Sequence, residues 1–242
     1  MSMELGIGTK LSRCETCSIR HQAVCGALTG PELARLNQIA KPRKVAAGQT
    51  IMSDEDPATF LANVVSGVVK LSKTLPDGRQ QVIGLLFSPD FLGRVFNETN
   101  PYFAEAAVDS EICSFPRKQF EALLDEFPGL EHRLLEHTLS ELDSAREWMV
   151  LLGRKTAQEK VASFLLLLAN RSLITGCHHI QPGEEASFEL PLSRNDIADY
   201  LGLTVETVSR QITRLKSANV INLVDNRHFT VPDLDRLRDI AG

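Results

Sequence analysis

The sequence predicts an α+β chain with a jelly-roll-like β domain, a long helix and a C-terminal winged helix-turn-helix. Three stretches predict it: many short β-rich runs within 43–115, an amphipathic run over 130–153, and two short helical runs around a glycine over 192–215. We expect four parts, which are an arm over 1–27, a β-roll domain over 28–129, a long helix over 130–155 and a winged helix-turn-helix domain over 156–242.

The arm is marked by Cys14, Cys17 and Cys25, three of the five cysteines of the chain. Thiolates are soft ligands, so this C-x2-C-x7-C pattern indicates Zn²⁺ or an iron–sulfur cluster rather than a chance grouping. Both usually take four protein ligands, and the residues leave the fourth open. The candidates are His21, which completes a pattern close to a zinc knuckle, and the distant Cys113 and Cys177.

A short helix and then strands are expected between the arm and the long helix. The helix is expected over 28–38. The run over 61–72 is β-rich and bounded by turn residues, and Pro76-Asp77-Gly78 marks a hairpin turn before the apolar run over 82–87. A last strand is expected over 111–115. This spacing of short strands indicates a jelly-roll-like sandwich, which would form the β-roll.

The long helix carries an apolar seam. It follows a helix expected over 117–127, which Pro128-Gly129 should end, and its apolar and small residues recur at steps of 3, 4, 3, 4 and 3. The seam consists of Leu135, Thr138, Leu142, Ala145, Met149 and Leu152, and Trp148 and Leu151 widen it. A helix packed on its own domain is the alternative, but the length and position of this one favour a homodimer interface. A buried helix over 158–170 and a loop or short hairpin over 175–187 should follow.

The helix-turn-helix is marked by caps and a break. Ser193 is a candidate N-cap, Gly202 breaks the run where a positive φ is needed, and Thr204 can cap the second helix. A step of about 100° per residue places Val208, Ile212 and Leu215 on one face of that helix and Glu206, Ser209, Arg210 and Thr213 on the other.

This second face offers a carboxylate acceptor, hydroxyls and a fork of donors. A helix lying in a DNA major groove needs such groups, whereas a helix turned to water does not. The alternative is a solvated helical hairpin in which Glu206 and Arg210 form an i,i+4 pair. The following residues favour DNA, because the runs over 220–224 and 228–231 around Asp225-Asn226-Arg227 are typical of the β-hairpin of a winged helix.

Composition and sequence patterns argue against a membrane-spanning protein, a secreted protein and an enzyme. Of 242 residues 43% are hydrophobic and 24% are charged, and no apolar run approaches the roughly 20 residues of a membrane span. Residues 1–8 lack a signal-peptide pattern, so we expect a cytoplasmic protein with reduced thiols. The net charge of −5 disfavours tight non-specific DNA binding, although Arg210, Arg214 and Lys216 outnumber Glu206 locally. No catalytic constellation stands out, so no enzyme activity is expected.

The order of β-roll, long helix and winged helix-turn-helix resembles the Crp/Fnr family of bacterial transcription regulators over essentially the whole chain. The run YLGLTVETVSR, from Tyr200 to Arg210, looks like the recognition motif of the Fnr branch. The cysteines point the same way. The seven-residue gap before Cys25 is longer than in the enterobacterial form and is similar to that of the α-proteobacterial FnrL, FnrN and cysteine-bearing FixK types.

The resemblance implies a [4Fe–4S] cluster held by Cys14, Cys17 and Cys25 in the arm and by Cys113 in the β-roll. It also implies that no cyclic nucleotide binds. The positions that would hold the cyclic phosphate read Gly93-Arg94 and Asn100-Pro101, so one Arg is missing and a Glu is replaced by a cation.

The function implied is that of an oxygen-responsive regulator, mainly an activator. Under low oxygen the cluster would favour a homodimer on a palindromic TTGA-type site, with Arg210 on guanine, Glu206 on cytosine and Ser209 on a neighbouring base. The hairpin over 74–81 would contact RNA polymerase. Alternatives are a zinc-stabilised or thiol-redox-controlled regulator without an iron–sulfur cluster, and a ligand-binding β-sandwich with a fortuitous helical hairpin.

Overall fold

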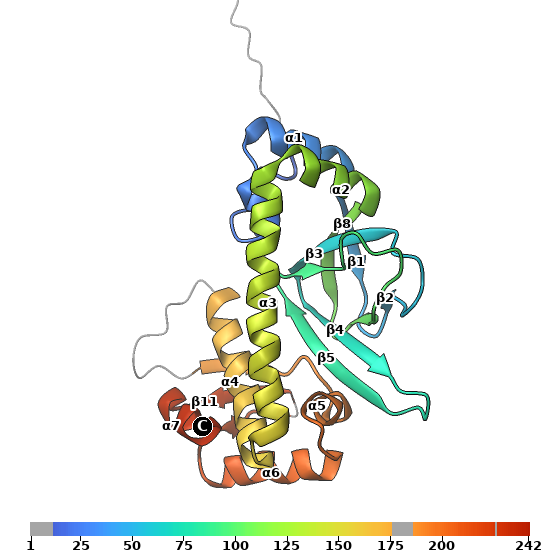
Figure 1. Cartoon of the computed structure of the whole chain (residues 1–242). Coiled ribbons are helices and arrows are strands. Elements are labelled where there is room, and N and C mark those ends of the chain that lie inside the picture. The colour runs from blue at the N-terminus through green and yellow to red at the C-terminus, as the bar shows by residue number, and fades with distance from the viewer. Residues whose placement is uncertain (1–11, 176–185, 226) are drawn as a thin grey trace, which may run out of the picture.

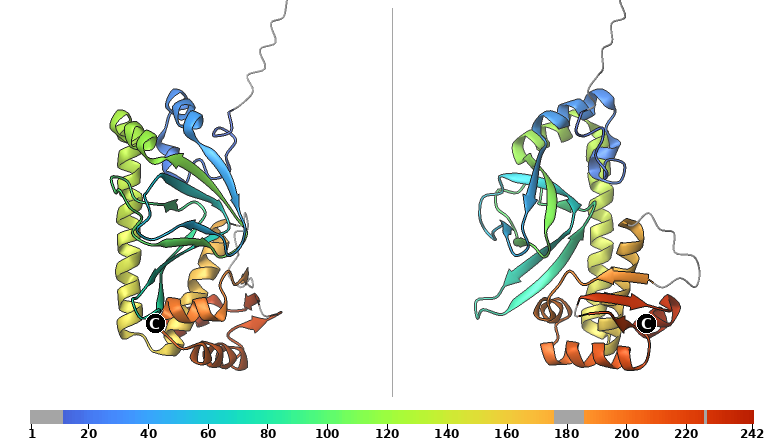
Figure 2. Two further views of the ribbon diagram at one scale, coloured as in Figure 1. Left: turned by 90° about the vertical axis from the view of Figure 1, so that its right-hand side faces the viewer. Right: turned by 180° about the vertical axis from the view of Figure 1, so that it is seen from behind.

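A single long helix organises the chain. The computed structural model describes residues 12–175, 186–225 and 227–242. Helix α3 (Pro128–Arg154) has 27 residues and is about 40 Å long. The β strands lie beside it, the N-terminal arm covers one of its ends, and the C-terminal helices gather around the other end (Figures 1 and 2). In the described residues no helix is long and apolar enough to cross a membrane.

The β-roll consists of two antiparallel four-stranded sheets, which confirms the predicted sandwich. Their strand orders are β1-β8-β3-β6 and β2-β7-β4-β5. The strands are β1 (Lys41–Val45), β2 (Thr50–Met52), β3 (Phe60–Ser66), β4 (Val68–Thr74), β5 (Gln80–Phe87), β6 (Phe91–Leu92), β7 (Phe103–Ala106) and β8 (Ser110–Pro116). Side chains from both sheets fill the layer between them, and Val64, Val69, Leu86 and Ile112 are at most 7% exposed there.

Two glycines determine how the strands connect. The β-rich run expected over 61–72 forms two strands, β3 and β4, because Gly67 turns between them at φ +84. A Cβ at Gly67 would come within 2.2 Å of Ser110 Oγ, so no other residue fits without a shift. The predicted hairpin turn is present between β4 and β5, where Gly78 has φ +87.

The helices at the arm end of the molecule are the 3₁₀ helix η1 (Val24–Ala27), α1 (Gly30–Ile39) and α2 (Arg117–Glu126). Thr29 and Glu32 form a capping box that begins α1. Pro128 ends the helix before it, as the sequence suggested, because a proline disfavours the helical backbone for the residue that precedes it. The break falls at Phe127, with φ −122 and ψ 90, and Pro128 begins α3, where its missing N–H has no helical partner to lose.

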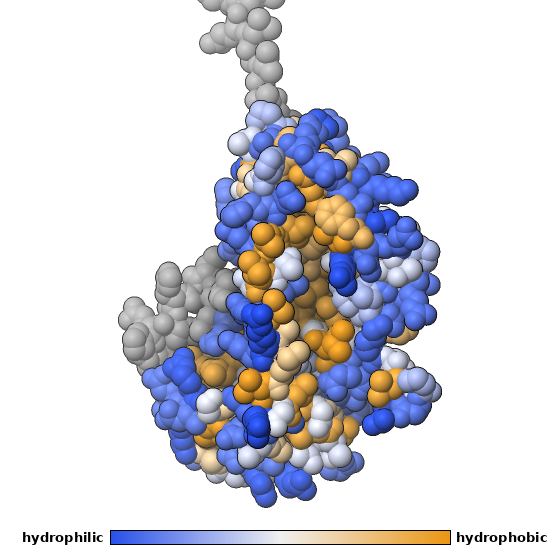
Figure 3. Space-filling view, viewed as in Figure 1, coloured by the Kyte–Doolittle hydropathy of each residue, from blue (hydrophilic) through white to orange (hydrophobic). Residues whose placement is uncertain are grey.

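The predicted seam of α3 lies in two environments. The exposed large apolar side chains of α3, which we call the outer seam, are Leu135, Leu142 and Met149 of the predicted seam together with Leu139 and Val150 beside it. Apolar side chains are visible along this helix in the space-filling view of Figure 3. Trp148 and Leu151 instead pack into the core of the C-terminal domain, which reaches this end of α3, and Leu152 packs against the same core. The prediction that Trp148 and Leu151 widen an outward stripe is therefore wrong.

The C-terminal domain is a winged helix-turn-helix, as predicted. Its helices are α4 (Ala157–Thr175), α5 (Arg194–Leu201), α6 (Val205–Ser217) and α7 (Leu234–Ala241), and its strands are β9 (Ala186–Glu189), β10 (Asn222–Leu223) and β11 (His228–Val231). The stretch expected as a loop or hairpin ends in β9, which pairs with β11 as a third strand. Helix α7 was not predicted.

Candidate nucleic-acid interface and cysteine group

Local hydrogen bonds fix the turn between α5 and α6. The Asp196 N–H donates to Ser193 Oγ at 3.1 Å, and the Asp196 carboxylate accepts in return, which completes a capping box. Gly202 takes the left-handed conformation at φ 60 and ψ 45. The Thr207 N–H donates to Thr204 Oγ1 at 3.3 Å and caps α6. The caps and the glycine turn predicted from the sequence are confirmed.

Helix α6 has one buried and one exposed face. Val208, Ile212 and Leu215 are at most 4% exposed and belong to the core of the C-terminal domain. The opposite face is exposed and carries the four predicted DNA-reading residues, Glu206, Ser209, Arg210 and Thr213. We call this opposite face the reading face.

Polar groups on the reading face are held by neighbours on the same helix. Arg210 Nη2 donates to Thr207 Oγ1 at 3.2 Å, and the Thr213 hydroxyl donates to the Ser209 carbonyl at 2.9 Å. Hydrogen bonds from the backbone of Glu206 and from the Thr204 hydroxyl lower the pKa of the Glu206 carboxyl. The reading face therefore combines a carboxylate acceptor with a guanidinium fork. Those groups match the cytosine amino group and the guanine O6 and N7 edge.

The wing is stabilised by one carboxylate. Asp225 accepts from the N–H groups of Arg227 at 2.7 Å and His228 at 2.8 Å, and its second oxygen lies 2.7 Å from His228 Nδ1. These hydrogen bonds lower the pKa of Asp225 to about 2. The Arg227 side chain is 72% exposed, so the hairpin presents a cation that suits a phosphate contact.

The second candidate site is formed by the thiols of Cys14, Cys17, Cys25 and Cys113, which we call the cysteine group. Cys14 and Cys25 are 9% and 7% exposed, Cys17 and Cys113 are half-buried, and all four are free thiols. Strand β8 carries Cys113, and the other three come from the arm. The Cys14 N–H donates to Asn37 Oδ1 of α1 at 3.3 Å, so a hydrogen bond ties the arm to the β-roll domain.

The thiols of this group share one apolar environment. Burial, followed by the neighbouring thiols, raises the pKa of Cys25 and of Cys113 to about 12. The neighbours that act on Cys113 are all three arm cysteines, which shows that the tertiary fold brings the distant β8 residue to the arm. Thiols of this kind keep their protons at neutral pH unless a metal replaces them.

The other two candidate ligands are placed differently. His21 is exposed at the surface of the arm, and Cys177 lies outside the described residues. Within the described parts of the chain, no group of three or more His, Cys, Asp or Glu side chains is arranged to hold a single metal ion. A four-iron cluster is larger than one ion and its ligands stand further apart, so a set of four apolar-packed thiols fits such a cluster in its donor chemistry.

Two arginines near the thiols were not recognised from the sequence. Burial and the Cys17 thiol raise the pKa of Cys14, while the charges of Arg13 and Arg20 act to lower it. The Arg20 guanidinium also donates to the Leu28 carbonyl at 3.5 Å. Cations in this position favour thiolates, which is the protonation state that binds a metal.

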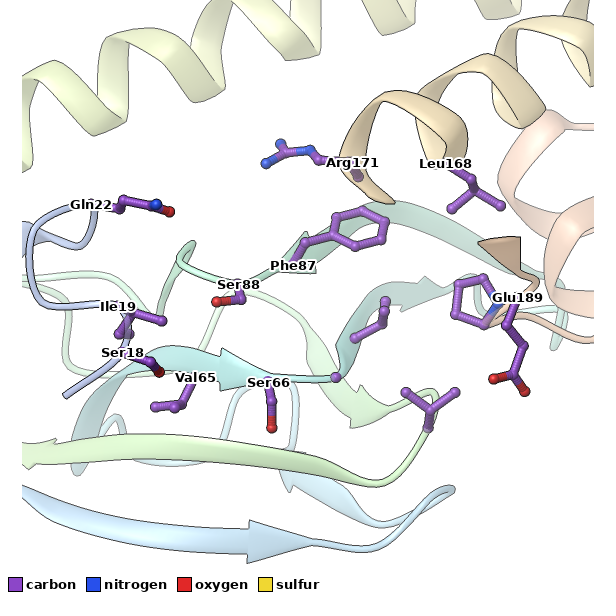
Figure 4. A pocket seen from close by; sticks show the side chains of 14 residues that line it. Ser18, Ile19, Gln22, Val65, Ser66, Phe87, Ser88, Leu168, Arg171 and Glu189 are labelled. Carbon is purple, nitrogen blue, oxygen red and sulfur yellow. The ribbon is translucent and has the colours of Figure 1, made fainter. Parts of the chain in front are cut away.

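A cavity of about 500 Å³ lies where the arm, the β-roll and the C-terminal domain meet (Figure 4). Ile19 and Gln22 line it from the arm, and Arg171 lines it from α4. Arg171 lies over the Phe87 ring of β5 at 5.3 Å and 3.5 Å from the Asp90 carboxylate. The arm and the C-terminal domain therefore border one common space beside the β-roll.

Comparison with known families gives two matches. Residues 159–240 match the model of the Crp-like helix-turn-helix domain, and residues 42–127 match the model of the cyclic nucleotide-binding domain. The first match covers α4 to α7, and the second covers the β-roll and α2. Together they account for the reading face and for the strand that carries Cys113.

Individual proteins are similar over nearly the whole chain. A probable transcriptional activator of Rhizobium leguminosarum bv. viciae is 49% identical over 93% of this chain and 91% of its own length. The transcriptional activator protein FnrL of Cereibacter sphaeroides is 47% identical over 98% of this chain and 94% of its own length. The structure of FixK2 from Bradyrhizobium japonicum has a TM-score of 0.75 at 31% identity, with 84% of this chain and 98% of that chain covered.

Proposed function

This chain belongs to the Crp/Fnr family of transcription regulators, and we propose that it is an activator whose DNA binding is switched by an iron–sulfur cluster. The observation that carries the proposal is the cysteine group. Four thiols from two distant segments meet in apolar surroundings, next to the helix whose outer seam is exposed. A purely structural arm would have no need for four thiols at one place.

Cys14, Cys17, Cys25 and Cys113 would hold the cluster, which we take to be [4Fe–4S]. When bound, it supplies an oxygen-labile bond between the arm and the β-roll. Loading requires the four thiols to lose their protons, and Arg13 and Arg20 favour that loss at Cys14. Cys113 then links β8 to the arm, in addition to the hydrogen bond between Cys14 and Asn37.

The arm can transmit its state to α3 because the two are in contact. Helix η1 packs on α3, and Arg133 Nη2 of α3 donates to the Gln22 carbonyl of the arm at 3.4 Å. Holding the arm in place therefore supports the N-terminal half of α3. We propose that α3 then pairs through its outer seam with the same helix of a second copy.

Dimerisation would bury the outer seam and bring two reading faces to one DNA duplex. Leu135, Leu142 and Met149 are 53%, 44% and 72% exposed in the single chain, which supports an apolar interface there. Ala145 is also exposed, and Leu152 would lie at the interface's edge. Two copies related by a twofold axis read a palindrome, for which we propose the TTGA type.

On each half-site, Arg210 would donate to guanine, Glu206 would accept from cytosine, and Ser209 and Thr213 would contact neighbouring groups.

The exposed tip of the β4–β5 hairpin, where Leu75 is 46% exposed, supports a contact with RNA polymerase. We also propose that no cyclic nucleotide binds. Asn100 is buried and donates to the Ser53 carbonyl at 3.1 Å, while Arg94 is exposed.

The experiment is anaerobic purification of the full chain, with iron and sulfide counted and the visible spectrum and DNA binding recorded before and after exposure to air. We expect four iron and four sulfide per chain, a brown colour, and DNA binding that air removes, as a [4Fe–4S] cluster requires. A colourless protein that contains zinc would overturn the cluster. A protein whose oxidised thiols alone release the DNA would favour a thiol switch.

A further inference from the structure

The β4–β5 hairpin of the β-roll is joined to the first helix of the helix-turn-helix by a partly buried ion pair. Lys70 on β4 is 7% exposed, and its Nζ lies 2.5 Å from Asp196 Oδ1 on α5 and 3.2 Å from Glu105 Oε1 on β7. Asp196 is also the residue that closes the capping box with Ser193. One ammonium group thus connects the β-roll to the N-terminal turn of α5.

The same hairpin holds the other end of α5. Gln81 Nε2 on β5 donates to the Asp199 carbonyl at 2.5 Å and lies 3.4 Å from the Tyr200 carbonyl. These carbonyls belong to the last turn of the helix, where acceptors lack partners within the helix itself. Lys70 and Gln81 therefore attach the β-roll to both ends of an eight-residue helix.

Apolar side chains of β5 and α5 also pack together, in addition to the polar contacts of Lys70 and Gln81. Val82 of β5 and Ile197 and Ala198 of α5 belong to one buried core cluster, with exposures of at most 3%. The neighbouring helices hold α5 as well, because Lys160 of α4 donates to the Leu201 carbonyl at 3.2 Å. The orientation of α5 relative to α3 is thus set by contacts on several sides, of which the two hairpin residues are the polar ones from the β-roll.

The protonation states suit a permanent ion pair. Burial acts to lower the pKa of Lys70, but its hydrogen bonds to Asp196 and Glu105 outweigh burial and raise it. Burial acts to raise the pKa of Asp196, and the hydrogen bonds from Lys70 and Ser193 outweigh it and lower the pKa. Opening the pair would deprive the buried Lys70 ammonium of the nearer of two carboxylate partners, Asp196 at 2.5 Å against Glu105 at 3.2 Å, so the pair resists opening.

We propose that Lys70 and Gln81 are positioning residues for DNA reading, which fix α5, and with it the reading face of α6, at a set angle to α3. This inference rests on the proposed function, because α3 would form the dimer that the two reading faces share. In a symmetric dimer the angle between α3 and α6 determines the separation of the two reading faces. Lys70 and Gln81 would therefore select the spacing between half-sites, while Arg210 and Glu206 select the bases.

The test compares DNA affinity over palindromes whose half-sites are moved together or apart by one and two base pairs. Each base pair moves a half-site by about 3.4 Å and turns it by about 35°. The anaerobically purified wild type should prefer one spacing by about tenfold or more, and Lys70→Met should reduce this preference to about twofold. Asp196→Asn should reproduce the effect, and Gln81→Glu, which replaces the donor by an acceptor, should act in the same direction.

The matched control is Lys73→Met. Lys73 lies on the same strand and pairs with Asp54 at 2.7 Å, within the β-roll alone, so its loss should leave the spacing preference unchanged. Base discrimination within one half-site should be unchanged in all four variants, which separates positioning from reading. Thermal unfolding of each variant identifies any loss of fold, and the double variant K70M/D196N should show no more effect than either single one.

An unchanged spacing preference in folded Lys70→Met and Gln81→Glu would overturn the proposal. A stronger affinity at every spacing would overturn it too, because the hairpin would then restrain DNA binding instead of aligning it. Failure of the proposed function looks different. A wild-type chain that binds no palindrome at any spacing would remove the DNA-binding dimer on which the inference depends.

Discussion

The reading face comes from nearby residues of one helix, whereas the cysteine group comes from the arm and from β8, which are far apart in the sequence. The caps of α5 and α6 join residues three positions apart, and their donors and acceptors are paired locally. Tertiary packing brings the β8 thiol to the arm thiols, and burial raises the pKa of Cys25 and of Cys113. The reading face is thus complete in the isolated chain, while the cysteine group, under the proposed function, is completed by a cluster.

This difference suits a switch. A part that must read the same bases in every cycle benefits from local bonds that persist when other parts move. A part that must respond to oxygen benefits from ligands drawn from separate segments. When the bound group is lost, those segments are free to move apart, and that movement can reach the rest of the molecule. The predictions below test whether the two regions are independent in this sense.

The largest effect is expected for Cys113→Ala. Without the β8 thiol the arm offers three ligands, and we expect the iron content after anaerobic purification to fall by about tenfold or more. DNA binding should fall with it, although the reading face is untouched. His21→Ala is the matched control and should retain its iron, because His21 is exposed. Full iron content in Cys113→Ala would exclude Cys113 as a ligand.

Arg210→Ala tests the other region. We expect a loss of about 1–3 kcal/mol in discrimination at the guanine of the half-site, with iron content unchanged. Arg214→Ala, one turn further along the exposed side of α6, should weaken binding to all sequences alike. Affinities measured over single-base variants of the site distinguish the two. Equal behaviour of both variants would contradict the base assignment of Arg210.

Asp196→Asn tests the junction between the regions and its pH dependence. The variant keeps the shape of the side chain but loses the charged hydrogen bond to Lys70, so the free energy of unfolding should fall by about 2 kcal/mol at neutral pH. Because the pKa of Asp196 is lowered in the folded chain, this contribution is complete above the unfolded value of about 3.9 and disappears as pH falls further. Denaturation of wild type and variant from pH 7 to pH 3 should show the difference shrinking towards the acid end.

The smallest effect is expected for Ser193→Ala. Loss of the N-cap of α5 should cost about 1 kcal/mol of stability and leave the iron content unchanged. Urea denaturation measures the stability, and an iron count measures the iron content. A loss of iron in this variant would show that the local motif and the cysteine group are coupled, which would contradict the independence argued above.

The sequence allowed good predictions where the chain is held by near neighbours. Ser193, Gly202 and Thr204 were assigned their roles correctly because each acts within three or four positions of itself. Gly78 was placed in its turn for the same reason. Pro128 was correctly predicted to end the helix before it, because a proline acts on the backbone of the preceding residue, here Phe127. That Pro128 also begins α3 was missed, since a proline is equally compatible with the start of the next helix.

Contacts between distant segments could not be read from composition or periodicity. The residues left the fourth partner of the arm cysteines open, and Cys113 was selected only through the family resemblance. Nothing near Lys70 in the sequence points to Asp196, which lies on another domain. Likewise Leu142 and Leu152 belong to the same predicted seam of α3, yet Leu142 is exposed and Leu152 packs against the core of the C-terminal domain, because the period records one helix face and not what covers it.

The stacking of Trp148 on Tyr200 provides an intrinsic fluorescent probe of the protein. The two rings lie 3.8 Å apart at 23°, one on α3 and the other on α5, and Trp148 is the single tryptophan of the chain. The emission of an indole moves to longer wavelength when water reaches it. Fluorescence from one residue would therefore report on the contact between α3 and α5 in solution, without a label, as oxygen or DNA is added.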